Sequence, residues 1–377
     1  MDTRSDRFMS EPFERVRLVD RSVSASHRPA DLETAAQVLL DARRIAVMTH
    51  VRTDGDGLSA WALASALKKL AKQVQVFADA PSELSWLRPD DPDLVDAGRL
   101  DPDAAIVTLD CANYARNAWP SPEREEVLAL LREFGGEGNV PLARYDAVRP
   151  VTLVIDHHIT NRAYGLWNWI EPDRAAVAEM VLELILVLQE LSGRDDLVDS
   201  AIARWLMAGI VTSTDWFRHH TDARIWRAAA WLEQTGGVDQ KAKAELAFNL
   251  TAVSPGYFRL SGALRHLTRI RAGVASVRVS RSLLERYGVT DDEAARFIDD
   301  MTALPAQMYV LLVELADGSI RARLRGRERR VDTIAQAFGG GGHEYASGTI
   351  LPNRTTARRL VRAAEASTNG EGLPRVR

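Results

Sequence analysis

Acidic and histidine side chains end or closely follow four short apolar runs of β-like character in this 377-residue chain. The residues at these four ends are His50, Asp54 and Asp56; Asp110; Asp156, His157 and His158; and Asp215. Ligand sites in open α/β sheets lie outside the carboxyl ends of parallel strands, so we expect these side chains to converge on one crevice. Because such a concentration of carboxylates is costly when it is uncompensated, the pattern predicts bound divalent cations.

This set of donor atoms matches what a two-metal phosphoesterase requires. Two ions about 3.5–4 Å apart activate a water molecule and stabilise both oxygens of an in-line displacement. Carboxylate oxygens favour Mn²⁺ or Mg²⁺, and imidazole favours Mn²⁺ over Mg²⁺. Zn²⁺ is the second choice, because the set is rich in carboxylates and contains no cysteine ligand. The expected cofactors are therefore two divalent cations, with Mn²⁺ first.

The same residues also have purely structural interpretations. The segment Asp54–Gly57 can be an ordinary turn in which an aspartate caps the following helix, although an EF-hand loop is excluded because no glutamate follows at the required spacing. The adjacent pair His157 and His158 is harder to explain this way, because the chain contains only eight histidines and core histidines are usually solitary. A second pair, His219 and His220, is interpreted as a solvated loop.

A glycine run near the C-terminus, Gly339–Gly342, is followed by His343. Four consecutive glycines let backbone N–H groups face an anion or a nucleobase without interference from Cβ atoms, and a flexible hinge or plain turn is the alternative. Upstream, Arg321, Arg323 and Arg325 alternate along an expected strand, so all three should project from one face. That face is either a phosphate- or carboxylate-binding edge or a solvated sheet surface.

Periodicity and capping signals predict the elements that would position these residues. In the N-terminal part we expect strands at 45–49, 74–78, 105–110 and 151–155, and helices at 31–44, 58–71, 122–134, 175–191 and 197–208. In the C-terminal part we expect strands at 275–280, 308–314 and 319–325, and helices at 331–338 and 354–366. The fold class is therefore α/β, with an N-terminal doubly wound, mostly parallel sheet covered by helices on both faces and a smaller C-terminal α/β domain with a mixed sheet.

Composition narrows the class of protein. An apolar content of 46% and a charged content of 27% are those of a soluble globular protein, and the length favours two domains. The net charge of −4 provides no overall basic field for long duplex nucleic acid. The single cysteine, Cys111, indicates a reducing compartment, and the chain contains neither a membrane-spanning apolar run nor a signal-peptide core. We therefore expect a cytoplasmic protein.

The triplet 156–158, Asp-His-His, and the downstream segment 331–348 with its Gly-Gly-Gly-Gly-His element resemble the DHH phosphoesterase superfamily and its DHH-associated domain. At this length the pairing is similar to the nanoRNase/pAp-phosphatase group and its cyclic-dinucleotide phosphodiesterase relatives. The resemblance extends from about residue 31 to about residue 352. The composition of residues 1–30, rich in Arg, Asp and Ser, indicates a flexible tail, and Pro255 and Gly256 indicate a linker region, placed at 246–272. The resemblance implies a DHH catalytic domain at 31–245 and a DHH-associated substrate-binding domain at 273–367, followed by a tail at 368–377.

The resemblance also implies roles for individual residues. One ion would be held by His50, Asp54 and Asp110, and the other by Asp56, Asp110, His157 and Asp215, with Asp110 bridging. His158 would lie near the scissile phosphate, which makes His158 and Asp110 the expected catalytic residues. The expected substrate-binding residues are Arg116, Arg325, Gly340, Gly341, Gly342 and His343.

Two segments depart from the family pattern. The first motif has Thr53, Gly57, Ser59 and Ala60 where Pro, Ala, Gly and Ser are usual, but the expected metal ligands are retained. The basic strand reads Arg-Leu-Arg-Gly at 323–326, where Ser-Leu-Arg-Ser is common. These departures bear on loop packing and on contacts with the substrate.

The resemblance implies hydrolysis of short nucleotides, namely nanoRNA, linear or cyclic dinucleotides, or pAp, and a homodimer is compatible with it. Two alternatives remain open. A pyrophosphatase or exopolyphosphatase would share the ligands of the first domain, but its second domain lacks a Gly-Gly-Gly-Gly-His element. A non-catalytic nucleotide- or RNA-binding protein would be indicated by loss of metal ligands, and no expected ligand is lost here.

Overall fold

The computed structural model describes residues 27–51, 53–78, 82–95, 98–218, 221–234, 237–327 and 329–368. The chain divides into two compact units, Met1–Thr251 and Ala252–Arg377. The region 246–272, expected to be a linker, is largely helical, because α8 (Gln240–Thr251) closes the first unit and α9 (Pro255–Leu267) opens the second. The expected tails fall mainly on residues 1–26 and 369–377, which lie outside the described residues.

The first unit is built on a six-stranded sheet of order β1-β6-β5-β4-β2-β3 in which every neighbouring pair is parallel. Its strands are β1 (Arg28–Pro29), β2 (Arg44–Met48), β3 (Gln73–Phe77), β4 (Ala105–Leu109), β5 (Val151–Asp156) and β6 (Gly165–Ile170). The chain runs from β2 to β3 in one direction and then returns to place β4 on the other side of β2. The sheet therefore has a topological switch point between β2 and β4, which is where such folds bind ligands.

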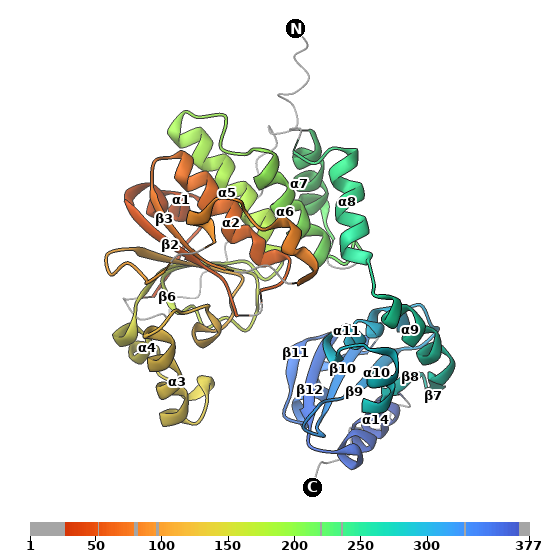
Figure 1. The fold of residues 1–377 in the computed structure, drawn as a ribbon. Coiled ribbons are helices and arrows are strands. Elements are labelled where there is room, and N and C mark those ends of the chain that lie inside the picture. The colour runs from red at the N-terminus through yellow and green to blue at the C-terminus, as the bar shows by residue number, and fades with distance from the viewer. Residues whose placement is uncertain are drawn as a thin grey trace. The chain divides into compact units, whose positions relative to one another are not determined.

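Helices cover both faces of this sheet, as the doubly wound prediction requires (Figure 1). The α-helices of the unit are α1 (Leu32–Asp41), α2 (Ser59–Lys69), α3 (Glu123–Phe134), α4 (Leu142–Val148), α5 (Val177–Ser192), α6 (Ser200–Ser213), α7 (Ala223–Gln234) and α8. Short 3₁₀ segments are η2 (Asp56–Leu58), η3 (Ser82–Leu87), η4 (Pro92–Leu94), η5 (Tyr114–Arg116) and η6 (Glu137–Asn139).

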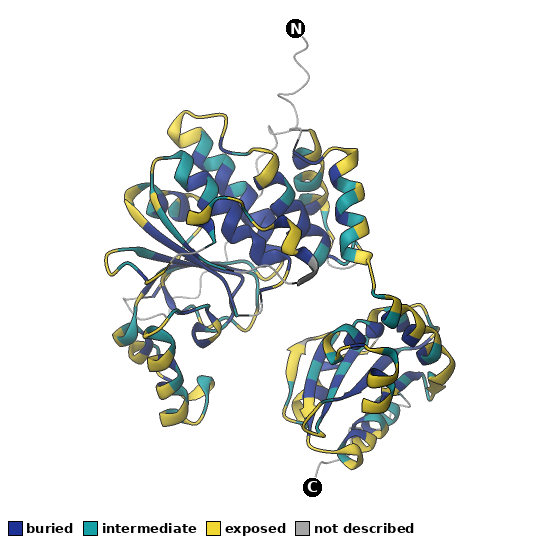
Figure 2. Ribbon diagram, in the orientation of Figure 1, coloured by how far each residue is buried: buried dark blue, intermediate teal, exposed yellow. Residues whose placement is uncertain are grey.

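Alternate side chains of each strand enter one of two cores. Ile45 and Val47 of β2 pack with the apolar residues of α1, α2, α5 and α6, whereas Ala46 and Met48 pack on the opposite face with those of α3 and α4. Figure 2 shows that α2, α5 and α6 are buried over most of their length. This explains why their sequences are apolar on nearly every side. Two filled cores hold the strand ends in fixed positions.

Three expectations for the first unit were wrong in detail. The fourth apolar run, Ile210–Asp215, is not a strand, since α6 continues to Ser213; a short apolar run does not distinguish a buried helix from a buried strand. The strand β6 was not predicted. Residues 28–29, assigned to the N-terminal tail, instead form β1 and pair with β6 in the sheet.

The second unit contains a mixed six-stranded sheet of order β11-β12-β10-β9-β8-β7, as predicted for the fold class. Only β8 and β9 are parallel among its described neighbouring pairs. Its strands are β7 (Arg269–Arg271), β8 (Val274–Val279), β9 (Met308–Glu314), β10 (Ile320–Gly326), β11 (Gly341–His343) and β12 (Ala346–Leu351). Its helices are α9, α10 (Arg281–Tyr287), α11 (Asp291–Ala295), α12 (Phe297–Met301), α13 (Asp332–Ala337) and α14 (Arg354–Thr368).

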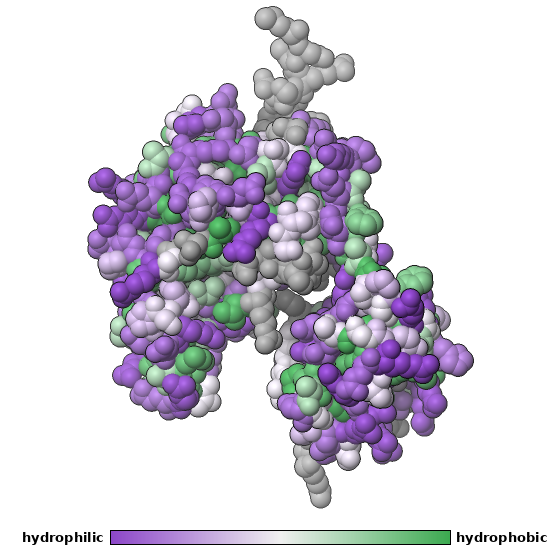
Figure 3. Space-filling view, viewed as in Figure 1, coloured by the Kyte–Doolittle hydropathy of each residue, from purple (hydrophilic) through white to green (hydrophobic). Residues whose placement is uncertain are grey.

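This sheet also has two cores. One lies between β8, β9 and the helices α9 to α12, and the other lies between the opposite face and the helices α13 and α14. Within the described part of the chain, no helix is both long and apolar enough to cross a lipid bilayer. On the face drawn in Figure 3, hydrophilic residues predominate at the surface of each unit.

Candidate metal centre

The loop after β2 positions the first group of candidate ligands. His50 lies two residues after the end of the strand, and its backbone carbonyl accepts a hydrogen bond from the Thr53 hydroxyl at 3.0 Å. Asp54 accepts backbone hydrogen bonds from Asp56 and Gly57 at 3.0 and 3.3 Å, so it caps the start of the following helical segment. The capping interpretation of this turn is therefore correct, and it does not compete with metal binding because a carboxylate oxygen has further lone pairs.

The glycines of this loop are required by close packing. A Cβ atom on Gly55 would collide with the side chain of Thr212 in α6, and one on Gly57 would collide with the side chain of Thr53. The first collision shows that the C-terminal end of α6 lies against the loop that carries Asp54. Helix α6 and β2 thus meet at the same edge of the sheet although they are distant in sequence.

Asp110 lies at the centre of the cluster, directly after β4. Its carboxylate Oδ2 is 3.6 Å from His50 Nε2, and its Oδ1 is 3.5 Å from His157 Nε2 and 3.7 Å from His158 Nδ1. These separations are too long for hydrogen bonds but suit atoms that share one cation. The backbone of Asp110 has φ of 54°, a left-handed conformation that is uncommon for residues other than glycine.

Asp110 also carries an unpaired buried oxygen. The residue is only 3% exposed, and Oδ1 has no hydrogen-bond partner. A buried carboxylate oxygen without a donor costs free energy unless a cation or proton compensates for it. This oxygen is therefore the clearest structural sign that the site is built for a positively charged ligand.

His157 and His158 are held by neighbouring groups. The Nδ1 atom of His157 lies 3.0 Å from the backbone carbonyl of Arg174, which leaves Nε2 directed toward Asp110. The Nδ1 atom of His158 lies 2.7 Å from the fully buried carboxylate of Asp156. That carboxylate also accepts hydrogen bonds from the His157 backbone and from Asn161. Such partners fix the orientation and tautomer of a ligating or catalytic imidazole.

Two predicted ligands, Asp56 and Asp215, make other contacts. Asp56 accepts backbone hydrogen bonds from Val177 and Ala178, both at 2.7 Å, and so caps the N-terminus of α5. Asp215 follows α6 with φ of 45°, and its carboxylate is 3.3 Å from Arg218. Their metal-binding roles therefore stay predictions. His219 and His220 lie outside the described residues.

The cluster is electrostatically strained in the absence of a cation. Burial, together with the charge of Asp54, raises the pKa of Asp110 to about 8 although His50 acts in the opposite direction. Burial alone would lower the pKa of His50, but the nearby carboxylates of Asp110 and Asp54 raise it to about 10. Burial also raises the pKa of Asp56. Protons thus compensate for negative charge that divalent cations would otherwise neutralise.

The described residues contain two groups that could hold a metal ion, and they share Asp110. One is His50, Asp54 and Asp110; the other is Asp110, His157 and His158. In each group the candidate ligand atoms lie within 4.8 Å of one another. Imidazole and carboxylate donors, together with the unpaired Asp110 oxygen, fit a divalent cation of the Mn²⁺, Mg²⁺ or Zn²⁺ class.

Residues 44–210 match the DHH family, N-terminal domain. The first unit carries a DHH-family domain. The matched segment contains β2, β4 and β5, whose carboxyl ends provide His50, Asp110 and the Asp-His-His triplet. The resemblance to the DHH family predicted from the sequence is thereby confirmed for this segment.

Named relatives extend the match beyond the DHH domain. The bifunctional oligoribonuclease and PAP phosphatase NrnA of Thermus thermophilus is 28% identical over 325 residues, which cover 85% of this chain and 88% of the relative. The protein of the same name from Bacillus subtilis is 28% identical over 251 residues, which cover 66% of this chain and 77% of the relative. An exopolyphosphatase-related protein from Bacteroides fragilis has a TM-score of 0.71 at 18% identity, covering 93% of this chain and 99% of that protein. The last likeness concerns the fold alone.

The sequence did not indicate two buried charged residues of this region, Arg174 and Glu179. Arg174 is buried and forms ion pairs with Glu171 at 2.6 Å and Glu183 at 2.7 Å, and its carbonyl faces His157. Glu179, in the first turn of α5, accepts a hydrogen bond from the Ala175 backbone. Charged residues are normally expected to be exposed, so the sequence carried no clear signal for these two buried side chains.

The predicted substrate-binding residues lie in different environments. Arg116 is exposed in η5, and its carbonyl accepts a hydrogen bond from Val51, so its segment adjoins the loop after β2. Arg325 pairs with Asp299 of α12 at 3.3 Å. The glycine run is not a free hinge, because Gly341–His343 forms β11 and pairs with β12. Within it, a Cβ atom on Gly340 would collide with the β12 backbone.

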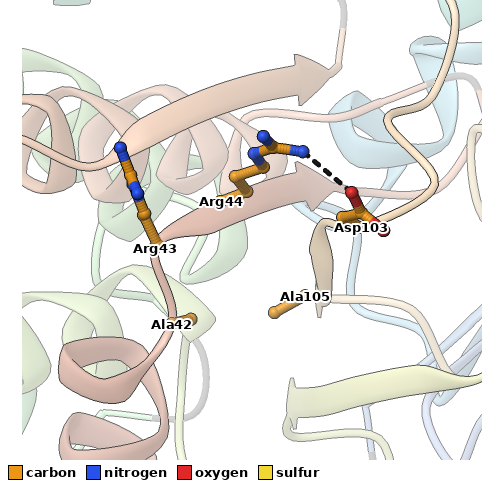
Figure 4. A pocket seen from close by; sticks show the side chains of 5 residues that line it. All are labelled: Ala42, Arg43, Arg44, Asp103 and Ala105. Carbon is orange, nitrogen blue, oxygen red and sulfur yellow. Dashed lines mark hydrogen bonds and ion pairs between the residues drawn. The ribbon is translucent and has the colours of Figure 1, made fainter.

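A surface pocket on the DHH domain is separate from this cluster. It is lined by Ala42, Arg43, Arg44, Asp103 and Ala105, and an Arg44–Asp103 ion pair of 2.9 Å spans it (Figure 4). These residues lie at the amino ends of β2 and β4, whereas the candidate ligands lie at the carboxyl ends. The pocket therefore belongs to the edge of the sheet opposite the candidate metal centre.

Proposed function

We propose that this chain is a metal-dependent phosphodiesterase and phosphatase that hydrolyses short nucleotides, namely nanoRNA, linear or cyclic dinucleotides, or pAp. The observation that carries the proposal is the unpaired, buried Asp110 oxygen among His50, His157 and His158 at the switch point of a DHH domain. The NrnA relatives support the class of substrate, because they are named as oligoribonuclease and PAP phosphatase. The location proposed for this chain is the cytoplasm, since a single cysteine is typical of a reducing compartment.

Two divalent cations, with Mn²⁺ preferred, are proposed for the site. His50, Asp54 and Asp110 would hold one ion, and Asp110 with His157 the other, with Asp56 and Asp215 completing its shell. An imidazole in each group favours Mn²⁺ over Mg²⁺. When bound, such ions polarise the phosphoryl group and lower the pKa of water, so no separate strong base is required.

The protein side chains orient the substrate in this proposal. His158, held through Nδ1 by Asp156, would face the scissile phosphate and stabilise charge that develops there. Arg116, exposed beside the loop after β2, would contact a phosphate of the substrate. Arg325 and the segment from Gly340 through Gly341 and Gly342 to His343 would bind the end of the substrate away from the scissile bond.

The test is a product-resolved assay with Mn²⁺ on oligoribonucleotides of graded length, linear and cyclic dinucleotides, and pAp, with pyrophosphate and inorganic polyphosphate as comparison substrates. We expect two- to five-mers to be cleaved faster than long chains, and the inorganic substrates to be poor. Preferential cleavage of long RNA, or of pyrophosphate or polyphosphate, would contradict the proposal. The double variant Asp54→Ala, Asp56→Ala should lose bound metal and turnover together; unchanged activity would exclude the metal centre.

A further inference from the structure

Three arginines lie in a row on β10, and their electrostatic environments differ. Arg321, Arg323 and Arg325 alternate with the buried residues Ile320, Ala322 and Leu324, so the sequence prediction that all three share one face is correct. Arg321 pairs with Asp291 at 3.3 Å and also with Asp292, both in α11. Arg325 pairs with Asp299 of α12. The two outer guanidinium groups are therefore balanced by carboxylates from the neighbouring helices.

The central arginine is not balanced in this way. Among the described residues, Arg323 has no hydrogen bond and no ion pair through its side chain, although it is partly buried. Desolvation, followed by the positive charge of Arg325, lowers its pKa. A partly desolvated guanidinium with five unused donors gains more from an anion than an exposed or already paired arginine does.

The sheet beside Arg323 is open. Strand register places Arg323 opposite Gly348 of β12, and Gly348 opposite Gly341 of β11, so two glycines extend the row toward the sheet edge. Gly341 is exposed, and a Cβ atom there would meet no other atom within 4 Å. Ile350, which pairs with Arg321 in the same register, is 54% exposed. Figure 2 shows exposed residues at the β11 edge of this sheet. We call the row Arg323, Gly348 and Gly341 the glycine floor.

The charge of the whole unit favours an anionic ligand on this floor. Residues Ala252–Arg377 contain 20 arginines, no lysine and 13 acidic residues, whereas residues Met1–Thr251 contain 28 basic and 39 acidic residues. The two units therefore have net charges of opposite sign, and the second is positive. Arginine rather than lysine is the residue that binds phosphate oxygens in a bidentate manner.

We propose that Arg323 is the anion-binding residue of the glycine floor and that it makes the enzyme selective for short nucleotides with a terminal phosphomonoester. A terminal phosphomonoester carries about −1.5 to −2 charges near pH 7 and has three accessible oxygens, whereas an internal diester carries a single charge. The inference rests on the proposed function and specifies its substrate. It also assigns a purpose to the departure at this position, where the resembling families commonly have serine.

The experiment compares pApA with ApA, which differ only in the 5′-terminal phosphate, using the full chain. KM and kcat are measured with Mn²⁺, and equilibrium binding is measured in EDTA, where no metal-dependent turnover occurs. We expect wild type to bind pApA about 10- to 100-fold more tightly than ApA. In Arg323→Ser this ratio should fall to within about threefold. Arg323→Lys, which retains the charge without the planar fork, should show an intermediate ratio.

Arg321→Ser is the matched control, because it removes an arginine from the same strand face that is already paired with carboxylates. It should keep the wild-type ratio. Equal binding of pApA and ApA by wild type, or a wild-type ratio in Arg323→Ser, would overturn the assignment of Arg323. Failure of wild type to hydrolyse either dinucleotide would instead contradict the proposed function, and the EDTA titration would still decide the role of Arg323.

Discussion

The carboxyl edge of the first sheet and the arginine face of the second sheet both gather like charges, but they balance them differently. In the first, Asp110 is buried, and one of its oxygens has no hydrogen-bond partner. In the second, Arg321 and Arg325 are each paired with carboxylates of neighbouring helices, and only Arg323 between them has no ion pair among the described residues.

The lack of a partner, rather than the residue type, singles out Asp110 and Arg323 as candidate binding groups in these two regions. Aspartates and arginines are common at strand ends and on sheet faces, and most are neutralised by a partner or by water. The Oδ1 atom of Asp110 has no hydrogen-bond partner, and the left-handed backbone adds a second unfavourable feature at the same residue. Strained and uncompensated groups of this kind persist where function requires them.

The largest effect is expected when the carboxylate charge of Asp110 is removed. Asparagine keeps the size of the side chain and tolerates a positive φ, so Asp110→Asn should preserve the fold. We expect kcat with Mn²⁺ to fall by about 10³-fold, together with loss of bound metal measured by elemental analysis. In EDTA the variant should be at least as resistant to thermal unfolding as wild type, because the repulsion from Asp54 is relieved.

Asp103→Asn is the control for that variant, because Asp103 pairs with Arg44 at the opposite edge of the sheet and is 76% exposed. It should retain metal content and activity. If Asp110→Asn kept its metal and its turnover, the carboxylate would be structural and the comparison would fail.

A smaller effect is expected where a balanced charge orients a side chain that is proposed to be catalytic. Asp156 is fully buried and holds His158, so Asp156→Asn should reduce kcat by about 10- to 100-fold. Asp156 raises the pKa of His158 against the effect of burial, so this pKa, followed by NMR in the metal-free protein, should fall in the variant. Circular dichroism at the assay temperature checks the fold. An unchanged His158 pKa would show that Asp156 does not act through this imidazole.

The smallest effect on catalysis is expected at Glu179. Here the consequence of a buried carboxylate oxygen without a partner is measured as a change in the stability of the protein. Burial raises the pKa of Glu179 from 4.5 to about 7, and its Oε2 has no hydrogen-bond partner. Since the folded-state pKa lies above the unfolded value, the stabilisation is complete below about pH 4.5 and is lost as the pH rises through about 7. The loss is at most about 3 kcal/mol.

Urea unfolding of wild type and Glu179→Gln at several pH values measures this contribution, because the difference between the two curves cancels the titration of other groups. The glutamine keeps an oxygen for the Ala175 N–H group and cannot ionise. We expect the wild-type stability to fall relative to the variant between pH 4.5 and 7. Parallel profiles would mean that folding does not raise the pKa of Glu179.

Most of the site was predictable because strand ends can be recognised in the sequence. The residues His50, Asp110, His157 and His158 follow apolar runs that form β2, β4 and β5, and the parallel sheet brings them together as expected. The helices α2 and α3 and the strands β9 and β10 also agree with the predicted ranges to within one or two residues.

Other parts were not predictable because they depend on contacts between distant segments. Asp56 caps α5, which starts more than 100 residues later, and no local pattern indicates that pairing. The run at 210–215 looked like a strand because α6 is buried on nearly every side and so lost its helical periodicity. Arg174 is buried by its pairing with Glu171 and Glu183, a property of the folded chain alone.

The sequence by itself determined which chemical groups this protein has and which strand ends carry them, because local apolar patterns specify strands and each strand ends at a definite residue. Only the tertiary structure decided which charges remain unbalanced. Whether a carboxylate or a guanidinium has a partner depends on side chains that remote segments bring close to it. Asp110 is the negatively charged example and Arg323 the positively charged one. The strength of an electrostatic interaction depends on the distance between the charges and on their burial, and the sequence alone specifies neither.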